Sequence, residues 1–344
     1  MITTWHVSCT EVKAVSDKLL EVDKLQKFFI TSQGTVRAVD EVSFSIVGGE
    51  TLGLVGESGS GKSTVAYTVV GLHSPTSGRI LFEGKDISKS VFKRPKELKK
   101  SIQIVFQDPG TSLNSRRTIQ QILELPLKVH RLGDSHDRKE RVVELLERVE
   151  LPSDYMYKSP HALGGGERQM VAIARPLATN PQLIILDEPT SALDVSIQAK
   201  IINMLIKFQK EMNLSYLFIT HDLSLMRNVA TRVAIMYLGK ICEVAETSEF
   251  FASPLHPYTK MLLSSIPVVS EEEEAMKPAK ITSEGEIPSP VNVPPGCGFH
   301  TRCTVVQGAI CSQEIPGMVE VEPGHLVRCH LYPHPYDSDK TGKE

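Results

Sequence analysis

A glycine-rich segment that ends in a lysine is the first place where residue types and their spacing indicate chemistry. It reads Gly56-Glu57-Ser58-Gly59-Ser60-Gly61-Lys62-Ser63-Thr64 and matches the pattern G-x-x-x-x-G-K-[ST]. Glycines here let backbone N–H groups curl around a β-phosphate, because no Cβ stands in the way. Lys62 can then bridge the β- and γ-phosphates, while the Ser63 hydroxyl can bind Mg²⁺. The segment predicts a site for a nucleoside triphosphate and magnesium, contacted by Gly56, Ser58, Gly59, Ser60, Gly61, Lys62, Ser63 and Thr64.

A pair of carboxylates follows a short apolar run further along the chain. Residues 183–186 are all apolar, and Asp187 and Glu188 come directly after them. A carboxylate at the carboxyl end of a buried strand lies where open α/β sheets bind ligands. We expect Asp187 to hold Mg²⁺, mostly through water, and Glu188 to polarise the attacking water as a general base. A chance turn or an ordinary strand end is the bland alternative for each motif alone, but together they favour nucleotide hydrolysis.

The elements around these motifs alternate between strand and helix. Residues 50–55, 182–186 and 215–220 are apolar runs typical of strands buried on both faces of a parallel sheet. Residues 62–72 and 196–211 have helical character and follow two of the motifs. Between 115 and 158 the pattern turns helical and charged, which predicts a helical insertion into an α/β fold. The phosphate-binding segment therefore lies between a predicted strand and a predicted helix, as its chemistry requires.

Composition excludes several other classes of function. The chain has 344 residues, of which 41% are hydrophobic and 23% charged, and its net charge is −3. A slightly acidic chain gives no global field for bulk binding to nucleic acid. No apolar run reaches the roughly 18 residues that span a bilayer, and the start of the chain has no basic and apolar regions of a secretory signal. We therefore expect a cytosolic protein that would serve a membrane only through a partner.

Prolines and cysteines divide the chain into unequal parts. Twelve of the 21 prolines lie in residues 251–344, and four of the six cysteines lie between Cys297 and Cys329. The acidic run Glu271–Glu274 leads into a stretch bearing proline and serine, which is typical of a linker. The sequence therefore predicts an N-terminal extension at 1–17, a nucleotide-binding domain at 18–250 and a loop-rich C-terminal domain at 251–344. The end of the chain, from residue 332, is expected to be a mobile tail.

Four further motifs follow in the order found in the ATP-binding cassette (ABC) family of transport ATPases, which residues 18–250 resemble. They are the Q-loop Gln107, the signature Leu163-Gly164-Gly165-Gly166-Glu167, the D-loop Ser191-Ala192-Leu193-Asp194 and the switch His221. The resemblance implies an α/β P-loop NTPase fold, with a RecA-like core and a helical subdomain at about 108–165. It also implies ATP as the nucleotide, catalytic roles for Glu188, His221 and Gln107, and a contact of Gln107 with Mg²⁺.

Members of this family work as pairs of domains that hold two ATP molecules head to tail. The resemblance therefore implies that Gly164, Gly165, Gly166, Glu167 and Asp194 contact, in trans, the ATP held by a second subunit. An aromatic residue in the first strand region stacks on adenine in this family. We assign that role to Phe28, and we expect one of the two adjacent rings, Phe28 or Phe29, only to pack in the core.

Three segments give a finer resemblance, to the ATPase subunits of oligopeptide and dipeptide importers. They are FQDP with SLN at 106–114, SALDVSIQ at 191–198 and SPLHPYT at 253–259. The first two, together with MYLGK at 236–240, resemble the second of the two ATPases that such importers use. The resemblance implies transmembrane permease subunits, a second ABC ATPase as homo- or heterodimer partner and, indirectly, an extracytoplasmic peptide-binding protein. It places the chain on the cytoplasmic face of the membrane. Nickel importers share the pattern, so the substrate class rests on analogy.

Three residues depart from the family pattern. Gly164 replaces the usual signature serine, and Glu167 replaces the usual glutamine. Glycine keeps the backbone donors of the helix N-terminus but lacks the hydroxyl that would bind a γ-phosphate. Pro176 stands in the predicted helix 167–179, where an interior proline costs about 3 kcal/mol or more.

Two other functions of ABC ATPases, soluble work on DNA or ribosomes and export, have sequence features that this chain lacks. A soluble ABC ATPase of DNA repair or ribosome work usually carries a long coiled-coil insertion or two cassettes in one chain. This chain has one phosphate-binding motif and no heptad run. An exporter more often has a membrane span fused to the cassette, and this sequence contains no such span.

Cys297, Cys303, Cys311 and Cys329 form the last candidate site. A reducing cytosol disfavours structural disulfides, and this argues for a metal or a cluster. Zinc ligands usually come as pairs two to four residues apart, and no such pair exists here. Four cysteines on irregular loops suit a [4Fe–4S] cluster, and a similar region holds one in some peptide-importer ATPases. Zinc and four buried free thiols remain the alternatives. We expect the cluster to be structural, because the segment is too small and Pro-rich to hold a core alone.

Overall fold

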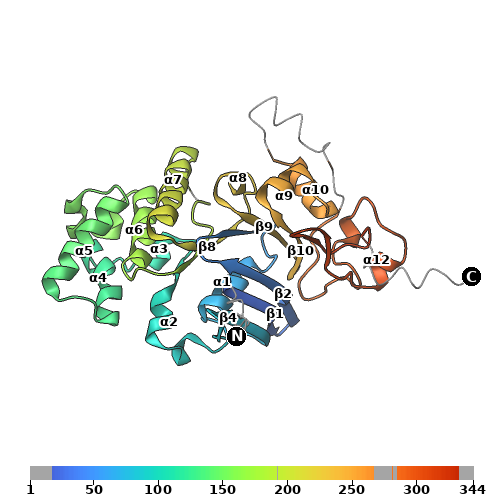
Figure 1. Cartoon of the computed structure of the whole chain (residues 1–344), viewed down its shortest axis with the longest axis horizontal. Helices are drawn as coiled ribbons and strands as arrows, with labels where there is room; N and C mark the ends of the chain where they lie inside the picture. The colour runs from blue at the N-terminus through green and yellow to red at the C-terminus, as the bar shows by residue number, and fades with distance from the viewer. Residues whose placement is uncertain (1–17, 192, 267–280, 282–284, 333–344) are drawn as a thin grey trace, which may run out of the picture.

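The computed structural model describes residues 18–191, 193–266, 281 and 285–332 (Figure 1). Two expectations lie outside these residues, the N-terminal extension 1–17 and the acidic run Glu271–Glu274. Of the expected tail, only its first residue, Tyr332, is described. Within the described part, no helix is both long enough and apolar enough to cross a membrane.

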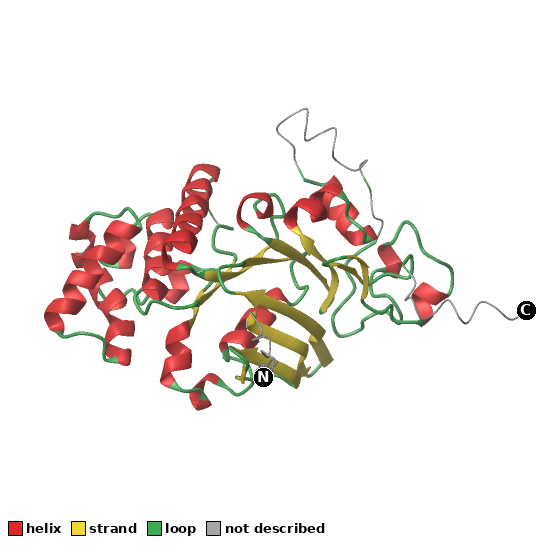
Figure 2. Cartoon of the chain, in the orientation of Figure 1, coloured by secondary structure: helices red, strands yellow, loops and turns green. Residues whose placement is uncertain are grey.

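A mixed sheet forms the centre of the described part (Figure 2). Its strands lie in the order β11 (Val319–Glu322), β12 (His325–Val327), β10 (Lys240–Glu246), β9 (Arg232–Tyr237), β3 (Thr51–Val55), β8 (Ser215–Thr220), β7 (Leu183–Asp187) and β6 (Ile102–Val105). The strands from β9 to β6 pair in parallel, whereas β10, β12 and β11 pair antiparallel. Every residue of β3, β7 and β8 is buried, which explains their continuous apolar runs. The predicted parallel α/β core is therefore confirmed.

A smaller antiparallel sheet covers one side of this core. Its order is β2 (Gly34–Val47), β1 (Lys18–Thr31), β4 (Ser77–Phe82) and β5 (Lys85–Asp86). Helix α1 (Lys62–Val70) lies between the two sheets, because Val65, Ala66 and Val69 share one hydrophobic cluster with strands of both. This arrangement holds the first turn of α1, and the phosphate-binding segment before it, against two layers of packed strands.

Helices gather at one end of the molecule, on the left in Figures 1 and 2. In chain order the helices around the core are η1 (Val91–Lys93), α2 (Lys96–Ser101), α3 (Pro109–Ser112), α4 (Ile119–His130), α5 (Ser135–Arg148), η2 (Ser153–Tyr157), η3 (Pro160–Ala162), α6 (Gly165–Leu177), α7 (Val195–Met212) and α8 (Met226–Val229). Buried residues of α4, α5 and α6 belong to the second hydrophobic cluster, with Leu123, Leu145 and Ile173 among them. The helical segment therefore begins after β6 and returns to the sheet through α6.

The C-terminal segment is joined to the nucleotide-binding domain by the sheet itself. Its helices are α9 (Thr247–Ala252), α10 (Pro257–Ser264), η4 (His300–Arg302) and α12 (Ile310–Gln313), and the rest of residues 285–318 is mostly loop. The β11–β12 hairpin continues the central sheet, with Glu243 of β10 opposite Val327 of β12. The C-terminal part is therefore loop-rich, as expected, but it also contributes two strands to the core sheet.

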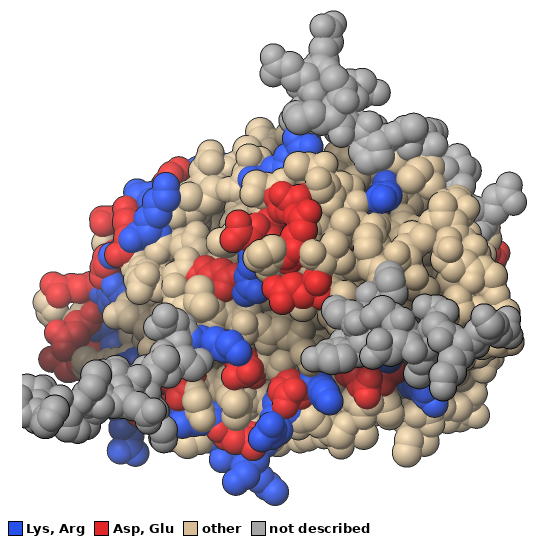
Figure 3. Space-filling model, turned by 45° about the vertical axis from the view of Figure 1, so that its right-hand side comes forward, with Lys and Arg blue, Asp and Glu red and all other residues tan. Residues whose placement is uncertain are grey.

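Charged side chains of both signs occupy the surface. Figure 3 shows acidic and basic groups interspersed over the described part of one face. This mixture agrees with the small net charge of −3.

Candidate functional site

Four strands of the central sheet end beside one another, and each is followed by a predicted site residue. Gly56 follows β3, His221 follows β8, Asp187 ends β7, and Gln107 comes two residues after β6. Because β3, β8, β7 and β6 are neighbours and parallel, their carboxyl ends meet at one edge of the sheet. Open α/β sheets bind ligands at this edge.

The glycine-rich segment forms a tight loop between β3 and α1. Gly61 is the N-cap of α1 and has φ of 107°, a conformation that favours glycine. A Cβ at Gly61 would also collide with the carbonyl of Ala38, so only glycine fits here. Lys62 begins the helix and is buried, and its Nζ donates to the Gly56 and Glu57 carbonyl oxygens at 2.7 and 2.9 Å. The ammonium group is therefore held inside the loop where a phosphate would lie.

Burial changes the ionisation of Lys62. Desolvation lowers the pKa of its ammonium group, while the charges of Glu188, Asp187 and Glu57 act in the opposite direction. The remaining residues of the loop, Ser58, Gly59, Ser60, Ser63 and Thr64, lie between β3 and the first turn of α1. Ser60 is buried, with its hydroxyl 3.4 Å from Lys62 Nζ.

Ser63 and Asp187 meet across the sheet edge. The Ser63 hydroxyl donates to Asp187 Oδ1 at 3.0 Å, although 124 residues separate them. The Asp187 side chain is fully buried, and its Oδ2 has no hydrogen-bond partner in the described part of the chain. Burial raises the pKa of Asp187, whereas Ser63 and Tyr67 lower it. A buried carboxylate oxygen without a partner beside a hydroxyl is a donor set that suits Mg²⁺.

Glu188 lies between two of the predicted catalytic residues. Gln107 Nε2 donates to Glu188 Oε2 at 2.9 Å, and His221 Nδ1 lies 3.3 Å from Glu188 Oε1. Glu188 has φ of 47°, an uncommon value for a residue other than glycine. Its backbone N–H donates to Ile219 O of β8, which fixes the turn after β7. The structure thus brings Gln107, Glu188 and His221 together, although they come from three different strands.

The two phenylalanines of β1 are both half-buried, so burial does not single out the one that packs in the core. Phe29 contacts His73 edge-on, with ring centroids 5.3 Å apart. Phe28 lies beside Arg37, whose guanidinium carbon is 5.9 Å from the ring centroid. β1 lies in the antiparallel sheet, between β2 and β4.

The signature segment caps helix α6. Gly164 is the N-cap, Gly165 is the first helical residue, and the Glu167 carboxylate accepts the Gly164 N–H at 2.7 Å. The Tyr155 hydroxyl donates to the same carboxylate at 2.9 Å. These two donors lower the pKa of Glu167, the Gly164 N–H most. Glu167 is thus explained as a helix cap that uses one of the free N–H groups at this terminus.

Neighbouring features of α6 and α7 complete this surface. A Cβ at Gly166 would lie 2.8 Å from Ile197 Cγ2, so glycine permits close packing of α6 on α7. Asp194 caps α7 by accepting the Ile197 N–H at 2.9 Å. The hydrogen bond from the Ser196 hydroxyl lowers the pKa of Asp194 most, and the Ile197 N–H lowers it further. Ala192 of the D-loop lies outside the described residues.

Pro176 lies inside α6, in its last turn. The prediction of a helix over 167–179 is wrong at both ends, since α6 spans Gly165–Leu177. Proline has no backbone N–H, so the helix loses one hydrogen bond at this position. Because the helix ends one residue later, little of it follows the proline. Its carbonyl accepts the Thr179 hydroxyl at 3.2 Å, which helps to close the helix.

Two residues near the phosphate loop were not predicted from the sequence. Arg302, next to Cys303, donates to both carboxylate oxygens of Glu57 at 2.8 and 3.0 Å. The Tyr258 hydroxyl accepts the Glu57 N–H at 3.0 Å. Tyr258 belongs to the SPLHPYT segment at 253–259, whose sequence resembles peptide-importer ATPases but does not indicate a contact with the phosphate loop.

The four predicted cysteines lie close enough to interact. Burial raises the pKa of Cys297, and the thiols of Cys311 and Cys303 raise it further. Burial likewise raises the pKa of Cys329 to about 11, with smaller contributions from the other three thiols. A fifth cysteine, Cys242, is also buried. Burial raises the pKa of its thiol, and Cys297 and Cys329 raise it further. All five are free thiols.

The spacing of these sulfurs is wider than that of a compact ion site. In the described part of the chain, every group of three potential ligand atoms within 4.8 Å of one another lacks cysteine. Backbone N–H groups nevertheless converge on the thiols. The Gln307 N–H donates to Cys311 Sγ at 3.3 Å. Backbone hydrogen bonds also reach the other three thiols: from Phe299 to Cys297, from Val305 to Cys303 and from Leu331 to Cys329.

Comparison with known proteins agrees with this geometry. Residues 39–191 match the family described as "ABC transporter", and residues 242–311 match "Oligopeptide/dipeptide transporter, C-terminal region". The chain is 49% identical over 327 residues to the oligopeptide transport ATP-binding protein AppF of Bacillus subtilis, covering 93% of this chain and 99% of the relative.

Solved structures are similar to the cassette portion. The ADP- and phosphate-bound dimer of the ATP-binding cassette MJ0796 matches with a TM-score of 0.60 and 30% identity, over 66% of this chain and 98% of that one. CbiO1 of Clostridium perfringens, part of the transporter complex cbiONQ, matches with a TM-score of 0.60 and 32% identity, over 69% and 92%.

Proposed function

This chain belongs to the ABC transporter family of ATPases, and from this premise we propose that it powers the import of oligopeptides or dipeptides. The observation that carries the proposal is the contact of Glu188 with both Gln107 and His221 at the end of β7. A carboxylate held by two polar side chains beside a phosphate loop is placed to accept a proton from water. That water would attack the γ-phosphorus of ATP, and cleavage of the β–γ bridging bond would leave ADP and phosphate.

The remaining residues of the loop would bind and orient ATP. The Lys62 ammonium would exchange its Gly56 and Glu57 carbonyl partners for phosphate oxygens. Ser63, Asp187 and Gln107 would hold Mg²⁺, whose charge lowers the barrier to phosphoryl transfer. The buried Oδ2 of Asp187, which has no partner in the described part, supports this assignment. Phe28, with one ring face beside Arg37, would stack on adenine.

A second subunit would complete each site. The exposed N-terminus of α6, with Gly164, Gly165 and Gly166, offers backbone N–H groups to a phosphate held by a partner. Glu167 and Asp194 lie on the same surface and would also face the partner's ATP. The dimeric state of the similar cassette MJ0796, bound to ADP and phosphate, supports a cycle in which ATP closes the pair and hydrolysis reopens it.

We infer the substrate class and the partners from the C-terminal region and from the similarity to a known relative. The oligopeptide/dipeptide C-terminal region at 242–311 and the similarity to AppF support peptides over nickel. An importer of this kind needs transmembrane permease subunits, a second ATPase of the same or another sequence, and an extracytoplasmic peptide-binding protein. The chain would then act as a peripheral subunit on the cytoplasmic face of the membrane.

A [4Fe–4S] cluster is our proposal for Cys297, Cys303, Cys311 and Cys329. One tetrahedral zinc ion, with Zn–S of about 2.3 Å, needs sulfurs about 3.8 Å apart. In the described part of the chain no three of these sulfurs lie within 4.8 Å of one another, so they are not arranged as around one zinc ion, and we propose a larger group between them. Backbone N–H groups directed at the sulfurs stabilise thiolates bound to iron. When bound, the cluster would clamp the surrounding loops and take no part in hydrolysis.

Transport by the assembled complex tests the proposed function. The chain is co-expressed with permease subunits of the peptide-importer class, and the complex is reconstituted into liposomes. We expect ATP-dependent uptake of labelled di- or oligopeptides, which is lost in a matched complex carrying Glu188→Gln. ATP-dependent uptake of nickel without peptide would overturn the substrate class. An ATPase that does not co-purify with any permease would favour a soluble ABC function instead.

A further inference from the structure

We propose that Glu249, Glu322 and His325 form a binding site for a divalent cation of the zinc class. The site would join helix α9 to the β11–β12 hairpin, far in sequence from the ATP motifs. One potential ligand atom from each of the three residues lies within 4.8 Å of the other two. Three elements of structure contribute: Glu249 from α9, Glu322 from the end of β11 and His325 from the start of β12.

His325 is the residue that makes this more than an acidic cluster. Its side chain is only 2% exposed. Its Nε2 lies 2.8 Å from Glu243 Oε1, so one ring nitrogen has a partner. The other nitrogen, Nδ1, is buried and has no hydrogen-bond partner among the residues that the structure describes. A buried imidazole nitrogen left without a partner costs free energy, unless a ligand takes its lone pair.

Glu243 prepares the ring for that ligand. Its carboxylate is fully buried and accepts backbone N–H groups from Leu255 and His256, both at 2.8 Å. Such a fixed acceptor holds the proton of His325 on Nε2 and leaves Nδ1 as a lone-pair donor. Histidines that bind metal ions commonly donate their second ring N–H to a carboxylate in this way. Glu243, His325 and an ion at Nδ1 would reproduce that arrangement.

The two carboxylates complete a three-ligand set. Glu249 is half-buried and Glu322 is exposed, so the site is open to solvent on one side and an ion can enter. Imidazole favours zinc and similar transition metals over calcium or magnesium, which prefer oxygen ligands alone. One histidine and two carboxylates leave a tetrahedral ion one position for water. Bound zinc would fasten the hairpin to α9.

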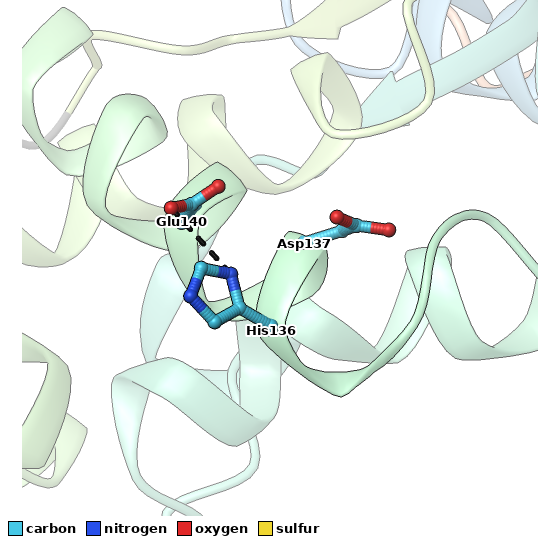
Figure 4. Close-up of side chains that lie close together, drawn as sticks. All are labelled: His136, Asp137 and Glu140. Atoms are coloured by element: carbon cyan, nitrogen blue, oxygen red, sulfur yellow. Dashed lines mark ion pairs between the residues drawn. The ribbon is translucent and has the colours of Figure 1, made fainter.

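A second group of three potential ligands lacks the buried histidine nitrogen that distinguishes the proposed site. His136, Asp137 and Glu140 also approach within 4.8 Å, but all three are exposed and lie on the first turns of α5. Figure 4 shows His136 and Glu140 facing each other, with Asp137 to one side of the pair. Asp137 already accepts the Asp134 N–H at 2.9 Å in the cap of the helix. All three side chains are exposed, so this group has no buried nitrogen or oxygen that needs a metal ion as its partner.

Metal binding to full-length variants tests the site. The protein, with its cysteine region intact, is freed of loosely bound metal and titrated with Zn²⁺ and, separately, with Co²⁺. The variants are Glu322→Gln and Glu249→Gln, which alter only half-buried or exposed positions and should fold. Glu320→Gln is the matched control, because Glu320 lies on the same strand and its carboxylate accepts the Gly324 N–H.

We expect the parent to bind one more zinc equivalent than Glu322→Gln and Glu249→Gln, or to bind it at least about tenfold more tightly. Glu320→Gln should match the parent. Cobalt at this site should give weak ligand-field bands without sulfur-to-cobalt charge transfer, because no thiolate is a ligand. Equal zinc binding by all four proteins would overturn the proposal, as would a cobalt spectrum showing thiolate ligation alone. ATP hydrolysis is not the readout, so the outcome is independent of the proposed transport function.

Discussion

Arg302 forms a bidentate ion pair with Glu57, with its terminal nitrogens 2.8 and 3.0 Å from the two carboxylate oxygens. The Arg302 side chain is only 8% exposed and that of Glu57 23%. Glu57 follows the first glycine of the phosphate loop, and Arg302 precedes Cys303 of the C-terminal loops. The pair therefore connects the cysteine region directly to the loop that would hold ATP.

Arg302→Ala should destabilise the protein and weaken ATP binding. Removing one partner leaves the Glu57 carboxylate partly buried without its charged donor, which costs about 1–3 kcal/mol. The free energy of unfolding and the Kd for ATP measure the two effects. Arg79→Ala is the control, since its pair with Asp23 is exposed and should contribute less than about 1 kcal/mol. Equal losses in both variants would show that the Arg302 pair has no special role.

Glu188→Gln should preserve ATP binding and suppress hydrolysis. Lys62 and Mg²⁺ supply most of the charge at the phosphates, whereas only the carboxylate of Glu188 can accept the proton of the attacking water. We expect turnover to fall by at least the roughly 10²–10⁴ typical of losing a general base. An ATP-bound dimer should then accumulate, and size-exclusion chromatography with ATP would detect it. Hydrolysis at the parent rate would remove Glu188 from the mechanism.

The isolated subunit should be a weak ATPase and largely monomeric without nucleotide, because each site needs a second chain. Gly164→Ser should raise ATP-dependent dimerisation or turnover by restoring a hydroxyl donor for the partner's γ-phosphate. A Cβ at Gly164 would lie 3.6 Å from Glu167 Oε2, an ordinary contact, so serine fits without rearrangement. Analytical ultracentrifugation and ATPase rates measure the effect. No change in either would mean that the backbone N–H groups suffice.

Anaerobically purified protein should be brown and contain about four irons per chain, as expected for a [4Fe–4S] cluster. Cys303→Ser should lower the iron content, because one of the four thiolates is removed. Metal analysis and visible absorption measure both. Colourless protein with one zinc per chain would overturn the cluster, and metal-free protein with the four thiols titratable would favour a core of free cysteines.

Asp187→Asn should raise the thermal unfolding temperature of the nucleotide-free protein and abolish its stabilisation by Mg²⁺ and ATP. Burial raises the folded-state pKa of Asp187, so its charged form is less stable in the folded chain than in the unfolded chain. As pH rises from the ordinary aspartate pKa through the raised one, the folded state retains a proton that the unfolded state has lost, and stability falls. The amide removes this loss but cannot replace the carboxylate as a ligand for Mg²⁺.

Asp86→Asn is the matched control for this prediction. Hydrogen bonds from Ser88 lower the pKa of Asp86, so its charged form favours folding, and that contribution is lost as pH falls through the lowered pKa. Neutralising Asp86 should therefore leave the unfolding temperature unchanged or lower it. A lower unfolding temperature in Asp187→Asn would contradict the predicted cost of burying this carboxylate.

Local sequence patterns predicted residues that the fold brings to one edge of the sheet, because each motif lies at or just after the end of a buried strand. Gly56, Gln107, Asp187 and His221 follow apolar runs, and the parallel order of those strands brings them to one edge. Short motifs of this kind need no long-range information. Fixed spacing and apolar strands were enough to predict the fold, and the structure places the glycine-rich segment between β3 and α1 as that prediction requires.

Contacts between distant segments could not be predicted in the same way. Arg302 and Glu57 are 245 residues apart, and nothing in either local sequence identifies the other. The β11–β12 hairpin is short, and its first strand alternates valine with glutamate, a pattern that indicates a strand but does not say which sheet the strand joins. His325 likewise reads as an ordinary polar residue until the fold buries it beside Glu243.

The hairpin also protects the nucleotide-binding domain from association through its sheet edge. Residues Ile241 to Ala245 of β10 are all buried, and β12 occupies the hydrogen-bonding edge of that strand. A chain truncated after residue 250 would leave a hydrophobic edge strand open to pairing with another molecule, a common route to aggregation. In the complete chain the outermost strand is the four-residue β11, whose Glu320 and Glu322 are exposed charges that discourage such pairing. The C-terminal region thus shields this sheet edge of the cassette, whatever it binds.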